Sequence, residues 1–208
     1  MVTTNAQSVV FPSTLKSIGD NAFRNAQNIK NISFEQNSQL ATIGEKAFQS
    51  SALQQVTIPA STTYIGQWAF ADCDLTEVVF EQNSQIQTLD AYAFFRCGPV
   101  ESIALPKSLK TIGASAFAGC SGAKKIVIGK AVTKIDDSAF EGCSSVAKVE
   151  IPDTVTSMGS YVFKDCTALG KVVLSKGMTK ITDGTFYGCK TLQDFKIHDK
   201  ITVIGKDA

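Results

Sequence analysis

The chain has 208 residues, of which 44% are hydrophobic and 19% charged, a balance typical of folded proteins and unlike that of disordered segments. The formal net charge is +1, without the strong basic excess of nucleic-acid-binding domains, so we expect no nucleic acid as a partner. No apolar run approaches the length needed to span a bilayer, and we therefore expect no direct membrane insertion of this chain.

Charge is divided unevenly along the chain. Residues 1–104 contain five Lys or Arg against nine Asp or Glu, and residues 105–208 contain fifteen against ten, so the halves carry about −4 and +5. Such an asymmetry can mark a surface that binds anions. Because both signs are mixed within each half, an ordinary solvated surface is the simpler interpretation.

The chain is organised by a repeat whose phenylalanine returns at a nearly fixed interval. The successive intervals are 25, 22, 24, 23, 23, 23 and 23 residues. A fixed period in the twenties is typical of a solenoid, in which each coil buries its apolar face against its neighbours. We therefore predict one domain over residues 1–208. The repeat phenylalanines are Phe23, Phe48, Phe70, Phe94, Phe117, Phe140, Phe163 and Phe186.

Each repeat unit divides into two short strands and a turn. In the unit around Pro152, apolar residues alternate over 146–151, as in a strand with one buried face, and the proline ends that strand because it donates no ladder hydrogen bond. A second extended run covers 155–158, Gly159 permits a tight turn, and Phe163 belongs to a compact turn or short 3₁₀ segment. Stacked coils then form two parallel sheets with neighbouring strands about 4.8 Å apart.

Both ends of the chain fall within a repeat unit. The last residues, KITVIGKDA, stop at Ala208, one residue before the phenylalanine that a 23-residue step from Phe186 predicts. Solenoids normally end in atypical capping repeats, and neither end offers one. We therefore expect the chain to be truncated at both ends from a longer protein.

Two units show the repeat nearly complete: LPKSLKTIGASAFAGC from Leu105 to Cys120, and IPDTVTSMGSYVFKDC from Ile151 to Cys166. This pattern resembles the BspA-like leucine-rich repeats, the 23-residue branch of the leucine-rich repeat superfamily, and the resemblance extends from Val9 onward. It implies a β-rich, right-handed leucine-rich repeat solenoid, here of about eight stacked coils with parallel sheets and short 3₁₀ turns. It also implies an extracellular or cell-surface location and a role in adhesion or protein recognition.

The cysteines share one position in the repeat, three residues after the phenylalanine. Equal phase places them in a column whose Cβ vectors do not converge as a disulfide requires, so we predict buried free thiols. No histidine shares the column and no paired CxxC occurs, which argues against a metal site. The six are Cys73, Cys97, Cys120, Cys143, Cys166 and Cys189, whereas Ala26 and Ser51 occupy the position in the first two units.

Nothing in the sequence indicates an enzyme. His198 is the only histidine and lies just after a predicted strand, with no nucleophile pattern around it, so we expect a surface or strand-end role. Paired carboxylates such as Asp136 and Asp137 are interpreted as turn residues. We predict no catalytic residues, no cofactor and no metal.

The outer face of the first predicted sheet is the best candidate for binding. Lys125, Lys148 and Lys171 are expected to stack as a ladder of like charge, which could receive an acidic protein segment or a sulfated glycan, although an extended solvated lysine row is the simpler interpretation. Valines on the same face add apolar spots suited to a protein contact. The candidate face is Glu77, Val79, Lys125, Val127, Lys148, Glu150, Lys171, Val173 and Lys196.

The sequence therefore predicts a non-catalytic recognition or adhesion module of a secreted or cell-surface protein, with a host or matrix protein or a sulfated glycan as partner. Stacked rigid strands suit this role because a preordered surface loses little entropy on binding. The alternative is a purely architectural spacer in a large surface protein, whose repeats set reach and bind nothing specific.

Overall fold

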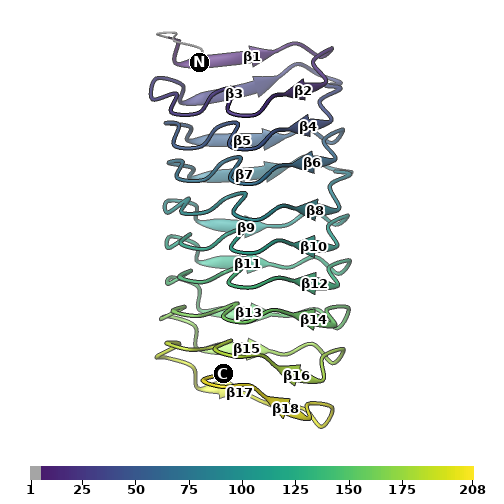
Figure 1. Cartoon of the computed structure of the whole chain (residues 1–208), viewed down its shortest axis with the longest axis vertical. Helices are drawn as coiled ribbons and strands as arrows, with labels where there is room; N and C mark the ends of the chain where they lie inside the picture. Colours follow the sequence, from purple (N-terminus) through teal and green to yellow (C-terminus); the bar gives the residue numbers. More distant parts are fainter. Residues whose placement is uncertain (1–5) are drawn as a thin grey trace.

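The structure, a computed structural model, describes residues 6–208, and the first five residues of the predicted domain lie outside the described range. Each coil consists of a first strand, a link, a second strand and a turn. Figure 1 shows the coils stacked in a column, with the two termini at opposite ends. The described residues form nine coils, one more than the approximate eight expected, because the last partial unit also contributes two strands.

The first strands of the coils carry odd numbers and form the first sheet. Their pairing is parallel throughout, in the segments β1-β3-β5-β7, β9-β11 and β13-β15-β17. A continuous ladder was expected, but strand pairing is interrupted between β7 and β9 and between β11 and β13. The strands are β1 (Ser8–Phe11), β3 (Asn31–Phe34), β5 (Gln55–Ile58), β7 (Glu77–Phe80), β9 (Ser102–Ala104), β11 (Lys125–Val127), β13 (Lys148–Glu150), β15 (Lys171–Val173) and β17 (Asp194–Phe195).

The second strands carry even numbers, are two residues long and form the second sheet. Seven of them pair in the order β14-β12-β10-β8-β6-β4-β2, and β16 pairs with β18. The strands are β2 (Ser17–Ile18), β4 (Thr42–Ile43), β6 (Tyr64–Ile65), β8 (Thr88–Leu89), β10 (Thr111–Ile112), β12 (Lys134–Ile135), β14 (Ser157–Met158), β16 (Lys180–Ile181) and β18 (Val203–Ile204).

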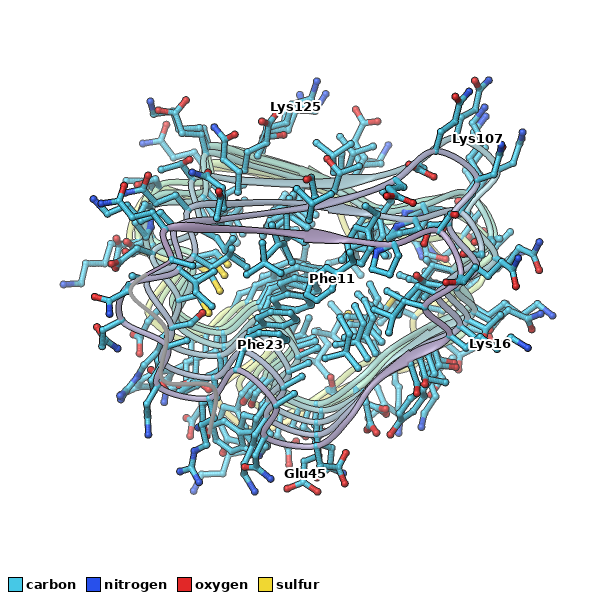
Figure 2. All side chains as sticks on the ribbon, turned by 90° about the horizontal axis from the view of Figure 1, so that it is seen from above. Phe11, Lys16, Phe23, Glu45, Lys107 and Lys125 are labelled. Carbon is cyan, nitrogen blue, oxygen red and sulfur yellow. The ribbon has the colours of Figure 1, made fainter. Side chains whose placement is uncertain are left out.

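The repeat phenylalanines stack on one another along the core. Phe48, Phe70 and Phe94 are 0% exposed, which confirms the inward-facing assignment. Neighbouring rings are nearly parallel, with interplanar angles between 3° and 9°. Figure 2 shows the labelled rings of Phe11 and Phe23 in the interior of the coil, with charged side chains around its outside.

The segment around each core phenylalanine consists of successive turns rather than a 3₁₀ helix. The residue two positions before the phenylalanine has a positive φ in each of the first eight coils, which breaks any helical run. The turns still pair from coil to coil: the Phe48 N–H donates to Ala69 O at 2.7 Å, and the Phe70 N–H donates to Ala93 O at 2.8 Å. Backbone groups in the turns are therefore satisfied by the neighbouring coil.

The cysteines form the predicted column of free thiols, five of them buried and Cys189 partly buried. Each thiol lies within hydrogen-bonding distance of the repeat phenylalanine carbonyl in the preceding coil, as in Cys73 Sγ to Phe48 O at 3.1 Å and Cys120 Sγ to Phe94 O at 3.3 Å. Burial raises the pKa of Cys73 to about 11 and that of Cys120 to about 12. These thiols therefore remain protonated at neutral pH and act as core residues.

The links between the two strands of a coil are held by carboxylates that reach a neighbouring coil. In the EQNSQ links, Glu35 Oε2 accepts from the Ser13 N–H at 2.9 Å, and Glu81 Oε2 accepts from the Ala60 N–H at 2.8 Å, each in the preceding coil. In a shorter link, Asp153 Oδ1 accepts from an N–H of the following coil. The longer links therefore remain anchored, although they add residues.

Candidate functional site

The candidate site lies on the outer face of the first sheet. All nine of its residues are exposed, and the valines Val79, Val127 and Val173 remain 39%, 42% and 45% exposed. The residues between them, such as Ile126 and Val172, point inward and are buried. The period-two pattern of the strands therefore places the nine side chains on one surface.

The lysine ladder is only partly as expected. Lys148 and Lys171 are direct neighbours in the register of β13 and β15, which also aligns Glu150 with Val173. Lys125 is aligned with Ser102 on β9, but the strand pairing is interrupted between β11 and β13. Two of the three lysines are therefore adjacent on paired strands, and the third lies across the break.

The charge on this face is also partly neutralised. Lys148 Nζ lies 2.5 Å from Glu150 Oε1, and this hydrogen bond lowers the pKa of the glutamate. Lys124 lies 3.7 Å from Glu101 at the edge of the face. Within residues 6–208, Lys125 and Lys196 have no ion-pair partner, so their charges are open to an anion.

A hollow of about 370 Å³ opens where β11 and β13 are not paired. Ile126, Val127 and Ile128 contribute to its apolar lining. Its charged lining residues are Lys124, Lys125, Lys148 and Glu150. Positive groups around an apolar floor can hold a ligand that carries both an anionic group and an apolar part. The hollow therefore lies on the outer face of the first sheet, at the interruption in strand pairing between β11 and β13.

A second hollow, of about 840 Å³, continues from the first and shares Val127, Ile128 and Glu150 with it. It adds Lys107 and Lys130, which occupy the same position in the links of two successive coils. Figure 2 shows Lys107 and Lys125 along the same side of the coil, across the core from Glu45.

The sequence interpretation missed Lys107 and Lys130, because it considered strand positions and left out the links. The signal that could have found them is the lysine that follows Pro106 and Gly129, at the same place in two neighbouring units.

The residues weighed for catalysis lie apart from this face. His198 Nε2 lies 2.9 Å from the carbonyl oxygen of Ser175, in a partly buried position. Asp137 Oδ1 accepts from the Ser160 N–H at 2.7 Å and Asp136 pairs with Lys134, which agrees with the interpretation of both aspartates as turn residues. Within the described part of the chain, no three His, Cys, Asp or Glu side chains gather as metal ligands would.

The family follows from the whole length of the repeat. The model of the BspA type leucine-rich repeat region matches residues 2–88 and 87–208, with six copies. The chain belongs to the BspA-type leucine-rich repeat family. This confirms the resemblance drawn from the repeat units, and the family and fold are typically non-catalytic.

Solved structures of leucine-rich repeat proteins share the fold of this BspA-type chain. A leucine-rich repeat protein from Bacteroides ovatus is 26% identical with a TM-score of 0.65, over 98% of this chain and 63% of that one. The pneumococcal vaccine antigen PcpA is 24% identical with a TM-score of 0.66, over 96% and 58%. A leucine-rich cell surface protein from Faecalibacterium prausnitzii is 24% identical with a TM-score of 0.50, over 95% and 68%.

The BspA-type chain spans less than two thirds of the first two of these structures, at 58% and 63% of their lengths. A search of curated proteins finds no significant match. Residues 6–208 include no helix with the length and hydropathy of a membrane span. The comparisons therefore establish family and fold.

Proposed function

We propose that this BspA-type chain is a recognition or adhesion module of a secreted or cell-surface protein, and that it binds an acidic segment of a host or matrix protein. The single observation that carries the proposal is the lysine-flanked apolar hollow at the break between β11 and β13. The location rests on the family and on two structural neighbours of similar fold, one named a vaccine antigen and one a cell surface protein.

A protein segment fits the hollow better than a glycan chain does, because its floor is apolar. Val127 and Ile128 line both hollows, and Ile151 and Val173 extend the apolar surface in the second. Burial of these aliphatic side chains by an apolar part of the partner stabilises the complex, whereas a sulfated glycan would contact only the lysines. The acidic groups of the partner would meet Lys125 first, since this lysine has no ion pair among the described residues.

The test compares binding by the native chain with binding by a variant of the lysine face. The variant carries Lys125→Glu, Lys148→Glu and Lys171→Glu, and the probes are immobilised matrix proteins, a synthetic peptide of alternating Glu and Val, and heparin. We expect binding of the peptide and of at least one matrix protein, with an affinity that falls as salt rises and is lost in the variant.

The matched control carries the same change in charge elsewhere, as Lys16→Glu, Lys110→Glu and Lys190→Glu, all exposed and outside the first sheet. A second variant, Val127→Ser with Val173→Ser, should bind the peptide more weakly but bind heparin as the native chain does. Equal loss in the control would show that net charge alone drives binding. Absence of binding to every probe would contradict the proposal and favour the architectural spacer.

A further inference from the structure

A cluster of aromatic side chains lies on the turns of the third and fourth coils, away from the lysine face. The rings of Trp68 and Tyr92 stack with their centroids 4.0 Å apart and an interplanar angle of 5°. Phe95 meets both rings edge-on, at 5.4 and 5.5 Å, and the Arg96 guanidinium lies 5.0 Å from the centre of the Phe95 ring. We call Trp68, Tyr92, Phe95 and Arg96 the aromatic turn cluster.

The fold does not require these aromatic side chains. Trp68, Tyr92 and Phe95 remain partly exposed, whereas the core phenylalanines of the same coils are fully buried. The next coil has Ser115 and Ala118 at the positions of Tyr92 and Phe95, and it forms the same turn. A reason other than core packing must therefore account for three large rings at this surface.

The turn backbone at this position is the same in the first eight coils. Trp68 and Tyr92 have φ values of 59° and 60°, in the left-handed region that suits Gly and Asn and disfavours bulky side chains. Other coils place Asn21, Lys46, Ser115, Ser138, Tyr161 and Gly184 at the same position, so the positive φ belongs to the repeat turn itself. What distinguishes Trp68 and Tyr92 is that two successive coils place large rings at this position and that these rings stack.

The surroundings of the cluster are acidic. Asp72 is exposed, its backbone N–H donates to the Phe95 carbonyl at 2.8 Å, and it has no ion-pair partner within residues 6–208. Asp90, two residues before Tyr92, accepts from the Tyr64 hydroxyl at 3.0 Å. Burial and the Asp90 carboxylate raise the pKa of Tyr64, with smaller contributions from Asp20 and Glu45. Two cations lie among these groups: Arg96, at the turn position that Asp72 occupies in the preceding coil, and Lys46, which pairs with Glu45. The carboxylates of Asp20, Glu45, Asp72 and Asp90 outnumber them.

From this geometry we propose that the aromatic turn cluster is a second binding site, which receives an arginine- or lysine-bearing segment of a partner protein. Aromatic rings attract cations through their faces, and carboxylates beside them complete the charge. Trp, Tyr and Arg are also the residue types that most often dominate protein interfaces, because rigid rings lose little entropy when bound. The acidic surroundings decide the sign of the partner's charge.

This site is separate from the lysine face. The turn that contains Lys46 and Glu45 continues into Trp68 and Tyr92, since the Lys46 N–H donates to Gln67 O and the Trp68 N–H donates to Ala91 O. Figure 2 shows Glu45 across the coil from Lys125. One partner could therefore be held at each surface without competition.

Trp68 is the only tryptophan, so its fluorescence reports directly on the cluster. The probe is a short peptide of alternating arginine and glycine, and the control peptide replaces arginine by neutral citrulline. We expect a saturable change in Trp68 emission with the arginine peptide, an affinity at least about tenfold weaker with citrulline, and weakening by salt.

The test variant carries Tyr92→Ser and Phe95→Ala, which copies the turn of the next coil and should therefore fold. Its affinity for the arginine peptide, measured by calorimetry, should fall about tenfold or more, whereas Tyr161→Ser, which copies Ser138, should leave it unchanged. Asp72→Asn should weaken binding by a few fold without changing the rings.

Three outcomes would overturn the proposal. They are no binding of the arginine peptide by the native chain, equal binding of the citrulline peptide, and full binding by the Tyr92→Ser, Phe95→Ala variant with an unchanged melting temperature. Self-association that disappears in this variant, without any peptide binding, would instead assign the cluster to a second copy of the chain. Because the lysine face is intact in every variant, binding of acidic probes tests the proposed function separately.

Discussion

The N-terminal and C-terminal halves of the solenoid share one backbone repeat but differ in core spacing and in surface. From Phe23 to Phe117, neighbouring ring centroids lie 5.1 to 5.2 Å apart, and from Phe117 to Phe186 they lie 5.6 to 6.0 Å apart. The first half carries about −4 and the aromatic turn cluster, and the second carries about +5 and most of the lysine face.

The difference shows which positions of the repeat are free to vary. Inward-facing positions keep their apolar character in both halves, because each coil is stabilised mainly by contact with its neighbours. Outward positions in strands, links and turns make few core contacts, so Ser115 and Tyr92 can occupy the same turn position. One scaffold can therefore carry an acidic aromatic surface and a basic apolar one.

The largest contrast is expected at alkaline pH, between the first two coils and the later ones. The cysteine column begins only at the third coil, so only the later coils should lose stability through their thiols. A thiol whose pKa rises on folding loses its proton first in the unfolded chain, so stability is full below the ordinary value of 9.0 and falls above it. The loss of stability continues up to the pKa of the folded state, which is about 11 for Cys73 and about 12 for Cys120. Each thiol should contribute a loss of about 1.4 kcal/mol per pH unit in that range.

Urea unfolding at several pH values measures this loss, and Cys120→Ala is the matched variant because Ala26 occupies the position in the first coil. In the variant, the free energy of unfolding should fall less steeply with pH above 9.0, by the contribution of one thiol. Hydrogen exchange should show that coils three to eight open before the first two coils. An identical slope in the variant would show that the thiols are not the groups that destabilise the fold.

The second contrast concerns the phenylalanine stack. Phe70 lies 5.2 and 5.1 Å from its neighbours, whereas Phe163 lies 5.6 and 6.0 Å from its own, and both are fully buried. Replacement by alanine leaves a cavity that costs about 3 to 5 kcal/mol. We expect the loss of stability to be near the upper end of this range for Phe70→Ala and near the lower end for Phe163→Ala, because dispersion attraction weakens quickly with the separation of the rings.

Denaturant unfolding of both variants provides the measurement, with the exposed Tyr187→Ala as the control for loss of an aromatic ring. A larger loss for Phe163→Ala would show that ring spacing does not govern the energy of the stack. Little change for either variant would contradict the role of the stack in stability.

The core could be predicted from the sequence because burial repeats with the chain. The regular spacing from Phe23 to Phe186 predicts the length of each coil. The alternation of apolar residues in segments such as 146–151 predicts the buried face of each strand. The break between β11 and β13 could not be predicted, because the repeat keeps its 23-residue step across this point and the sequence does not mark it. The hollow beside Lys125 depends on that break, so sequence alone gave its lysines but not its shape.

The aromatic turn cluster was missed for another reason. The turn position two residues before the phenylalanine is variable in the repeat pattern, so the pattern gives no reason to single out Trp68 or Tyr92. The stacking of their rings across two coils, with Phe95 edge-on to both, is visible only in the structure. The available signal was the bulk of Trp68 and Tyr92 in two successive units, where the next two units have Ser115 and Ser138.

The smallest contrast is expected in the links. In the first half Glu81 reaches back to the Ala60 N–H, and in the second half Asp153 reaches forward to the Lys176 N–H, at 2.8 Å in both cases. Replacement of either residue by alanine removes one charge-assisted hydrogen bond at an exposed site. We expect a loss of about 1 kcal/mol each, measured by urea unfolding.

The two links should nevertheless differ in local opening. The EQNSQ link is two residues longer than the proline-containing link and must order more backbone, so loss of its anchor releases more conformational entropy. Hydrogen exchange at the link should therefore increase more in Glu81→Ala than in Asp153→Ala, and Glu81→Gln should restore part of the protection because its amide oxygen still accepts. Equal exchange in the two alanine variants would show that the carboxylate does not order the longer link.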